Sequence, residues 1–70
     1  MFRNLMAEMA RADINNKEMA EKIGIGETAY GRKLKGTNDW NVSEMIAIQK
    51  ILNEELGTSY TLDYLFSPVA

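Results

Sequence analysis

Apolar residues at the start of the chain recur at the spacing of an amphipathic helix. They are Phe2, Leu5, Met6, Met9 and Ala10. This i, i+3, i+4, i+7, i+8 pattern places one apolar stripe along a helix of 3.6 residues per turn. It predicts a first helix of roughly three turns that ends near Ala12, where Asp13 interrupts the pattern.

The polar residues Asn15 and Glu18 have the spacing of a capping box. In such a box the N-cap side chain and the side chain three residues later each accept a backbone N–H that the helix leaves unpaired. Ile14 and Met19 occupy the two positions of a hydrophobic staple around this start. We therefore expect a second helix over residues 16–23.

The segment Gly24-Ile25-Gly26 is expected to be a tight turn. A glycine after a helix permits the left-handed backbone that ends it, and a third helix over residues 27–35 fits between this turn and Gly36. Tyr30 and Leu34 are the apolar positions of that helix. Together with Ile25 they would pin it to the core.

The start of a fourth helix repeats the capping-box pattern. Asn41 is the expected N-cap, Glu44 completes the box, and Trp40 is placed to form a staple with Met45. The helix would end at Gly57. Its apolar residues are Val42, Met45, Ile46, Ile48, Ile51, Leu52 and Leu56. Ile48 falls off the main stripe, so we expect it at the surface or at an interface.

Thr61 is placed to cap a short last helix over residues 62–66. Five helices in 70 residues leave no room for a sheet, so the expected fold is an all-α single domain over residues 1–70. The chain is 46% hydrophobic and 26% charged, which is ordinary for a globular domain rather than a disordered one. Methionines at positions 6, 9, 19 and 45 have core spacing and are expected to fill gaps in the interior.

The composition excludes several classes of function. The chain has no cysteine and no histidine, so it holds no disulfide, zinc finger, Ser-His or Cys-His catalytic pair. The adjacent Glu54 and Glu55 point about 100° apart on a helix and do not face each other as an acid-base pair would. We expect no enzymatic activity, cofactor, metal or small-molecule ligand. No apolar run is long enough for a membrane span and no signal peptide is recognisable, so a cytoplasmic protein is expected.

Charge is divided unevenly along the chain. Residues 1–36 hold seven basic and five acidic side chains, a net charge of +2, whereas residues 37–70 hold Lys50 against five acidic side chains, a net charge of −4. A dipolar molecule of this kind has one face suited to a polyanion, although its total charge of −2 is acidic.

The informative unit is the pair of short helices joined by the turn at residues 24–26. A turn of this length and composition, with the small Ala20 beneath it, allows two helices to cross steeply. Two interpretations are open. One is a helix-turn-helix that presents its second helix to DNA, and the other is an αα-corner used only for packing.

Residues 15–36 resemble, without a gap, the helix-turn-helix of the phage lambda repressor and Cro family, the XRE type. Residues 5–9, 40–48 and 62–66 resemble the first, fourth and fifth helices of that family. The last two segments are similar to those of prophage-encoded regulators in low-GC Gram-positive bacteria. The resemblance implies a five-helix lambda-repressor-like domain that binds operator DNA, with helix 27–35 in the major groove, and regulates transcription as a repressor or Cro-like protein.

The resemblance also implies roles for individual residues. Glu27, Thr28 and Arg32 match the family's outward base-reading positions. The residues expected at the DNA backbone are Asn16, Lys17, Lys33 and Lys35. These residue types suit the task, because arginine can bind guanine through two hydrogen bonds, threonine can contact a thymine methyl, and lysines bind phosphates.

Two residues depart from the family pattern. Glutamine is usual where this chain has Glu27, and a carboxylate in the first turn of a helix also interacts favourably with the helix dipole. Base contact and helix stabilisation are therefore both open for Glu27. Tyr30 replaces the usual valine or isoleucine, and we expect its ring in the core with a hydroxyl that stays in water.

A domain of this size contacts too few base pairs for operator specificity, so a homodimer is expected, formed in solution or only on double-stranded DNA. The end of the fourth helix and residues 62–69 are the expected contact surface. The alternative function is a protein-interaction module, such as an antitoxin or a small phage regulator. The basic outward face favours the first function, and the acidic total and Glu27 favour the second.

Overall fold

The computed structural model describes residues 1–68, and side-chain caps mark the starts of three of its helices. Residues 1–68 contain no strand. The helices are α1 (Arg3–Arg11), α2 (Asn16–Ile23), α3 (Glu27–Lys35), α4 (Val42–Leu56) and α5 (Leu62–Leu65). The all-α, five-helix organisation predicted from the sequence is confirmed for these residues. Val69, which we expected at a dimer contact, lies outside the described residues.

Both predicted capping boxes are present. In the first, Asn15 Oδ1 accepts the Glu18 N–H at 2.8 Å and Glu18 Oε1 accepts the Asn15 N–H at 3.2 Å. In the second, the corresponding distances between Asn41 and Glu44 are 2.8 and 3.0 Å. Thr61 caps α5 by accepting the N–H of Tyr64 at 3.1 Å. These bonds join residues three apart, so the starts of α2, α4 and α5 are fixed by neighbouring residues.

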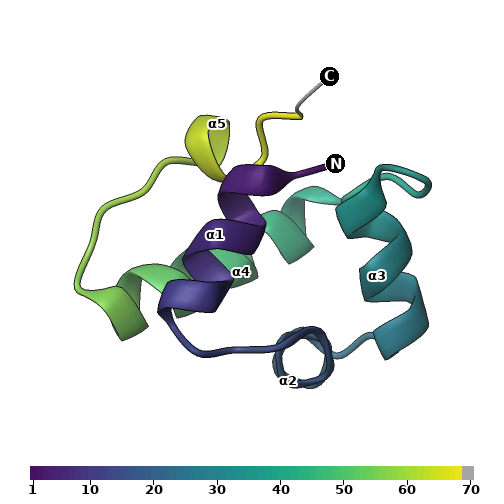
Figure 1. Ribbon diagram of the computed structural model, residues 1–70, viewed down its shortest axis with the longest axis horizontal. Helices are drawn as coiled ribbons and strands as arrows, with labels where there is room; N and C mark the ends of the chain where they lie inside the picture. The colour runs from purple at the N-terminus through teal and green to yellow at the C-terminus, as the bar shows by residue number, and fades with distance from the viewer. Residues whose placement is uncertain (69–70) are drawn as a thin grey trace.

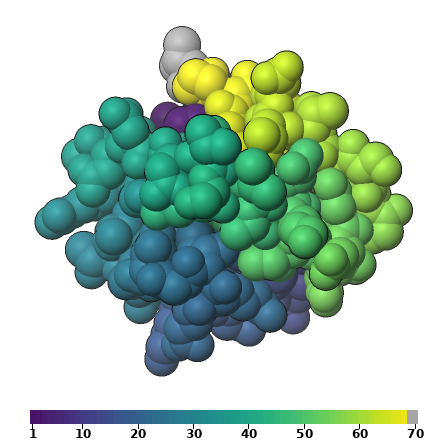
Figure 2. Space-filling view, turned by 180° about the vertical axis from the view of Figure 1, so that it is seen from behind, coloured from purple at the N-terminus to yellow at the C-terminus, as the bar shows by residue number. Residues whose placement is uncertain are grey.

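The helices enclose a single core (Figure 1). In that view α1 crosses in front of α4, α2 is seen end-on below them, and α3 stands upright at one edge. Seen from behind, α4 comes to the surface between α2 and α5 (Figure 2). The buried apolar residues are Leu5, Met9, Ala12, Ile14, Met19, Ala20, Tyr30, Leu34, Ile48, Leu52 and Leu65.

The buried face of α4 differs from our expectation. Ile48 is fully buried, whereas Val42 and Ile46 are 62% and 45% exposed. Packing against the neighbouring helices turns α4 so that Glu44, Ile48 and Leu52, spaced four apart, point inward. The prediction for Ile48 was wrong, because it considered only apolar residues and so missed that Glu44 belongs to the buried face of α4.

Two smaller differences concern the exposure of Met6 and the end of the last helix. Met6 is 42% exposed, whereas Met9 and Met19 are buried as expected. Position 6 lies beside the stripe formed by Leu5 and Met9, not on it. The last helix ends at Leu65, with Phe66 as its C-cap. Within the described residues, no helix is long and apolar enough to cross a membrane.

A buried carboxylate joins the two ends of the chain. Glu8 of α1 is fully buried, and its Oε2 accepts the Tyr64 hydroxyl of α5 at 2.6 Å. Arg11, one turn further along α1, donates to the same oxygen at 3.1 Å with a side chain that is 65% exposed. Burial raises the pKa of Glu8, but the hydrogen bond from Tyr64 and the charge of Arg11 outweigh it, so its pKa lies below the ordinary value.

Candidate functional site

The turn between α2 and α3 has the geometry that its glycines allow. Gly24 is in the left-handed conformation with φ of 80°, which ends α2 without the strain a side chain would bring. The Ile25 N–H donates to the Ala20 carbonyl at 3.0 Å. Ile25 is half-buried and Ala20 is buried beneath it, so α3 leaves the turn along a new direction while packing against α2 (Figure 1).

One face of α3 is buried and the opposite face is exposed. Tyr30 and Leu34 are buried. The exposed residues are Glu27, Thr28, Arg32 and Lys35. At 100° per residue they span an arc of roughly 140° around the helix. Gly31 lies within this arc, and no atom lies within 4 Å of where its Cβ would be. The three residues expected to read bases therefore share one outward face.

Tyr30 anchors the buried face of α3. Its side chain is fully buried, its hydroxyl donates to Met9 Sδ at 3.0 Å, and its ring packs edge-on against Trp40 with centroids 5.4 Å apart. The expectation of a core ring is confirmed, but the expectation of a hydroxyl in water is wrong, because the methionine sulfur of α1 receives it. Burial raises the pKa of Tyr30 above its ordinary value.

Lys33 does not lie on the open surface that we expected for a phosphate contact. Its ammonium is 2.5 Å from Glu44 Oε1, and 15% of its side chain is exposed. The ammonium also lies 5.9 Å from the centre of the Trp40 ring. The charge of Lys33 is therefore partnered inside the protein, and the structure separates this residue from the exposed cations Arg32 and Lys35.

Glu44 has two functions in the fold. Its Oε1 accepts the Asn41 N–H at 3.0 Å as part of the capping box, and the same oxygen receives Lys33. Burial raises the pKa of Glu44, but the hydrogen bond and charge of Lys33 and the bond from Asn41 outweigh it, so its pKa lies below the ordinary value. The residue pattern predicts the capping role but not the ion pair. The sequence feature that could have indicated the ion pair is the position of Glu44 four residues before Ile48, on the buried face of α4. A carboxylate buried there needs a partner.

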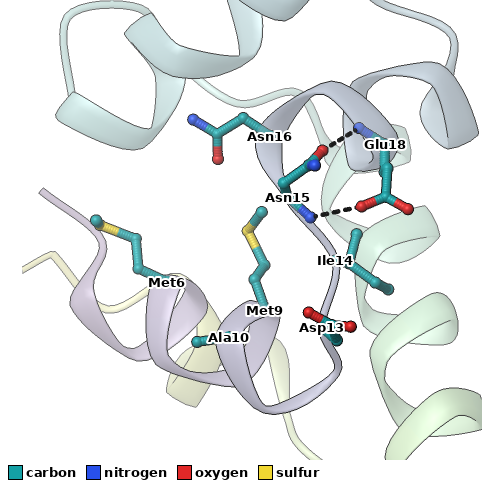
Figure 3. Close-up of a pocket in the computed structure, with 8 residues that line it drawn as sticks. All are labelled: Met6, Met9, Ala10, Asp13, Ile14, Asn15, Asn16 and Glu18. Atoms are coloured by element: carbon teal, nitrogen blue, oxygen red, sulfur yellow. Dashed lines mark hydrogen bonds between the residues drawn. The ribbon is translucent and has the colours of Figure 1, made fainter.

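The other residues expected at a nucleic-acid backbone are exposed. Asn16 and Lys17 lie in the first turn of α2, where helix N–H groups and the helix dipole favour an anion. The Asn16 side chain points away from the capping pair of Asn15 and Glu18 (Figure 3). Lys35 is exposed in the last turn of α3. These side chains can reach a phosphate without breaking an internal ion pair.

Glu27 is exposed in the first turn of α3, which has Gly26 as an N-cap without a side-chain hydrogen bond. A carboxylate at this position interacts favourably with the exposed N–H groups of the helix. The same exposure leaves it free to accept a bond from a partner. Base contact and helix stabilisation both remain predictions for this residue.

A groove of about 420 Å³ lies between α1 and the start of α2 (Figure 3). Its lining combines apolar side chains with the polar residues of the capping box. The lining residues are Met6, Met9, Ala10, Asp13, Ile14, Asn15, Asn16 and Glu18. In the part of the chain that the structure describes, no group of three or more Asp or Glu side chains is arranged to hold a metal ion.

Comparison with protein-family models, with curated proteins and with solved structures gave no match. The assignment of a function therefore depends on the residues and geometry described above.

Proposed function

We propose that this protein is a sequence-specific DNA-binding regulator of transcription, of the phage or prophage repressor and Cro-like kind. Its α2 and α3 would act as a helix-turn-helix, with α3 in the major groove of an operator. The outward face of α3 is the observation that carries the proposal. It combines Glu27, Thr28 and Arg32, all exposed, on a helix whose other face is anchored by Tyr30 and Leu34.

Each of the three side chains can recognise a base edge. Arg32 can donate two hydrogen bonds to guanine O6 and N7, and Thr28 can contact the methyl group of thymine. Glu27 can accept from the N4 amine of cytosine. Because the three residues lie on adjacent turns of one helix, they would read neighbouring base pairs.

Phosphate contacts would position α3 in the groove. The exposed Lys17 and Asn16 at the start of α2 and Lys35 at the end of α3 are suited to adjacent phosphates. Such contacts give affinity and orientation but little sequence information. We leave Lys33 out of this set, because its ammonium is paired with Glu44. A regulator of this kind would work in the bacterial cytoplasm.

The proposal includes a homodimer, because a pseudo-palindromic operator is read by two recognition helices related by a two-fold axis. The exposed apolar residues of α4 are Val42 and Ile46 at its beginning, which add to the contact surface expected at the end of α4 and after it. A groove of about 570 Å³ follows between α4 and α5, lined by Met45, Leu62, Asp63, Phe66, Ser67 and Pro68. This face of α4 (Figure 2) is the surface that supports the homodimer.

Selection of bound sequences from random DNA duplexes tests the proposal. The selected sites should be pseudo-palindromes with half-site centres about 10 base pairs, or a multiple, apart. Arg32→Ala should weaken binding to a selected site by about 1–3 kcal/mol per half-site and relax preference at one base pair. Lys50→Ala is the matched control, because Lys50 is the one basic residue of residues 37–70. No enrichment of any sequence would overturn the proposal.

A protein-interaction module is the second candidate function. The exposed Val42 and Ile46 and the acidic total of −2 favour it. It predicts that the wild-type protein fails to shift any duplex at low salt, whereas Val42→Ser and Ile46→Ser abolish assembly with a protein partner. A salt-dependent gel shift by the wild-type protein would favour DNA binding instead.

A further inference from the structure

We infer that Glu44 is a positioning residue for DNA recognition, which holds the Lys33 ammonium away from the phosphate backbone. This inference rests on the proposed function. It assigns to one carboxylate outside α3 a part in setting how strongly the protein prefers its operator over other DNA.

The ion pair is the ionic link between α3 and the rest of the protein. Of the ion pairs formed by residues 1–68, Glu8–Arg11 lies within α1, and Lys33–Glu44 joins two helices. Apart from its packing on α2, α3 is held by further contacts. The Phe2 N–H donates to the Leu34 carbonyl at 3.0 Å, and the Tyr30 side chain is buried in the core. Tyr30 and Lys33 are three residues apart, so they hold the same side of α3.

The link is rigid at its α4 end. Glu44 Oε1 accepts both the Asn41 N–H and the Lys33 ammonium, so the helix start that fixes Glu44 also fixes the position available to Lys33. Only 10% of the Glu44 side chain is exposed. Trp40 completes the enclosure, with its ring 5.9 Å from the ammonium. A lysine held in this way is oriented along α3 towards α4 and away from the outward arc.

Withholding one cation favours specificity over affinity. Each lysine that contacts a phosphate adds binding to every DNA sequence and makes the dependence on salt steeper. With Lys33 paired, the exposed cations of α2 and α3 are Lys17, Lys22, Arg32 and Lys35. Of these, Arg32 and Lys35 lie on the exposed arc of α3, and Arg32 is the proposed base-reading residue. By pairing with Lys33, Glu44 thus lowers the contribution of non-specific binding to the affinity for DNA.

The test is the salt dependence of DNA binding in three variants, measured on a selected operator and on a random duplex. Glu44→Gln keeps an oxygen for the capping box, since glutamine also completes such a box, but removes the charge that holds Lys33. We expect the slope of log K against log salt to become steeper by about 0.9 per protomer, and the ratio of operator to random-duplex affinity to fall.

Lys33→Met is the second variant. It keeps an apolar chain of similar length over Trp40 and removes the ammonium. We expect it to keep the wild-type salt slope, because Lys33 contacts no phosphate. The double variant Lys33→Met/Glu44→Gln should also have the wild-type slope, which would show that the effect of Glu44→Gln acts through Lys33.

Trp40 gives a readout without DNA. It is the one tryptophan of the chain and the Lys33 ammonium lies 5.9 Å from its ring, so its fluorescence senses a change around the ion pair. Lys33→Met and Glu44→Gln should both change its emission in the folded protein, and Lys50→Ala should not.

Two results would overturn the inference and are distinguishable. If Lys33→Met makes the salt slope shallower by about 0.9 per protomer, then Lys33 contacts a phosphate and only the inference fails. If wild-type protein does not prefer any selected duplex to a random one, the proposed function fails, and the inference fails with it.

Discussion

Two buried carboxylates, Glu8 and Glu44, have similar surroundings and connect different parts of the molecule. Each residue is buried, each pairs with a cation, and each has a pKa below its ordinary value. Glu8 connects α1 to α5 through the neutral hydroxyl of Tyr64. Glu44 connects α4 to α3 through the charged ammonium of Lys33.

The difference lies in what each carboxylate restrains. The cation paired with Glu8 is on its own helix and largely exposed, so the pair orders α1 locally and the hydroxyl of Tyr64 attaches the terminal helix. The cation paired with Glu44 belongs to the helix that carries the proposed base-reading residues. The first carboxylate therefore bears on the stability of the fold, and the second bears on the surface that the fold presents.

Acid should produce the largest change, because it removes both charges. A carboxyl whose pKa is lower in the folded state binds fewer protons there than in the unfolded state. Its contribution is complete above the ordinary pKa of 4.5 and is lost as the pH falls through the lowered folded value. Urea unfolding at decreasing pH should show a falling free energy of unfolding. The double variant Glu8→Gln/Glu44→Gln should show a flatter dependence, and an unchanged dependence would contradict the role given to these two carboxylates.

Glu8→Gln should lower the free energy of unfolding by about 1–3 kcal/mol, the range for losing hydrogen bonds to a buried charged group. Tyr64 would keep an oxygen to donate to, but Arg11 would lose its counter-charge. Urea unfolding followed by circular dichroism measures the change. Glu54→Gln, an exposed carboxylate of α4, is the control and should behave as wild type. DNA preference below the transition should stay unchanged.

Glu44→Gln should lower the free energy of unfolding by about 1 kcal/mol, typical of one net hydrogen bond. The capping oxygen is retained, and the long apolar chain of Lys33 can carry its ammonium to water. The same urea experiment measures this loss beside that of Glu8→Gln. A larger loss at Glu44 than at Glu8 would contradict the distinction between the two carboxylates, because Glu44 would then act mainly on the fold.

How much could be predicted from the sequence depended on the distance between interacting residues. Asn15 and Glu18 are three positions apart, so the boxes and helix starts they define could be predicted from the order of residues alone. Lys33 and Glu44 are separated by 11 positions, and Glu8 and Tyr64 by 56. These contacts exist only once helices pack, so no local pattern contained them.

The orientation of the side chains of α3 could be predicted only in part. Helical periodicity correctly put Thr28 and Arg32 outward, and Tyr30 and Leu34 inward. It also put Lys33 on the flank of the helix, where the exposure of its ammonium depends on which residue of the neighbouring helix faces it. An acidic residue from α4 was there. Ile48 was misjudged for the same reason, because the rotation of α4 is set by its neighbours and by the buried Glu44.

Gly31 has a consequence for how such a surface can acquire new partners. It lies in the middle of an exposed helical arc, and a Cβ there would meet no atom within 4 Å. A side chain at this position would be tolerated by the fold, and most residues would strengthen the helix, since glycine in a helix interior costs about 0.5–1 kcal/mol relative to alanine. Substitutions at position 31 are therefore expected to cost the fold little, and a library of them would test whether this surface recognises a partner on the same scaffold.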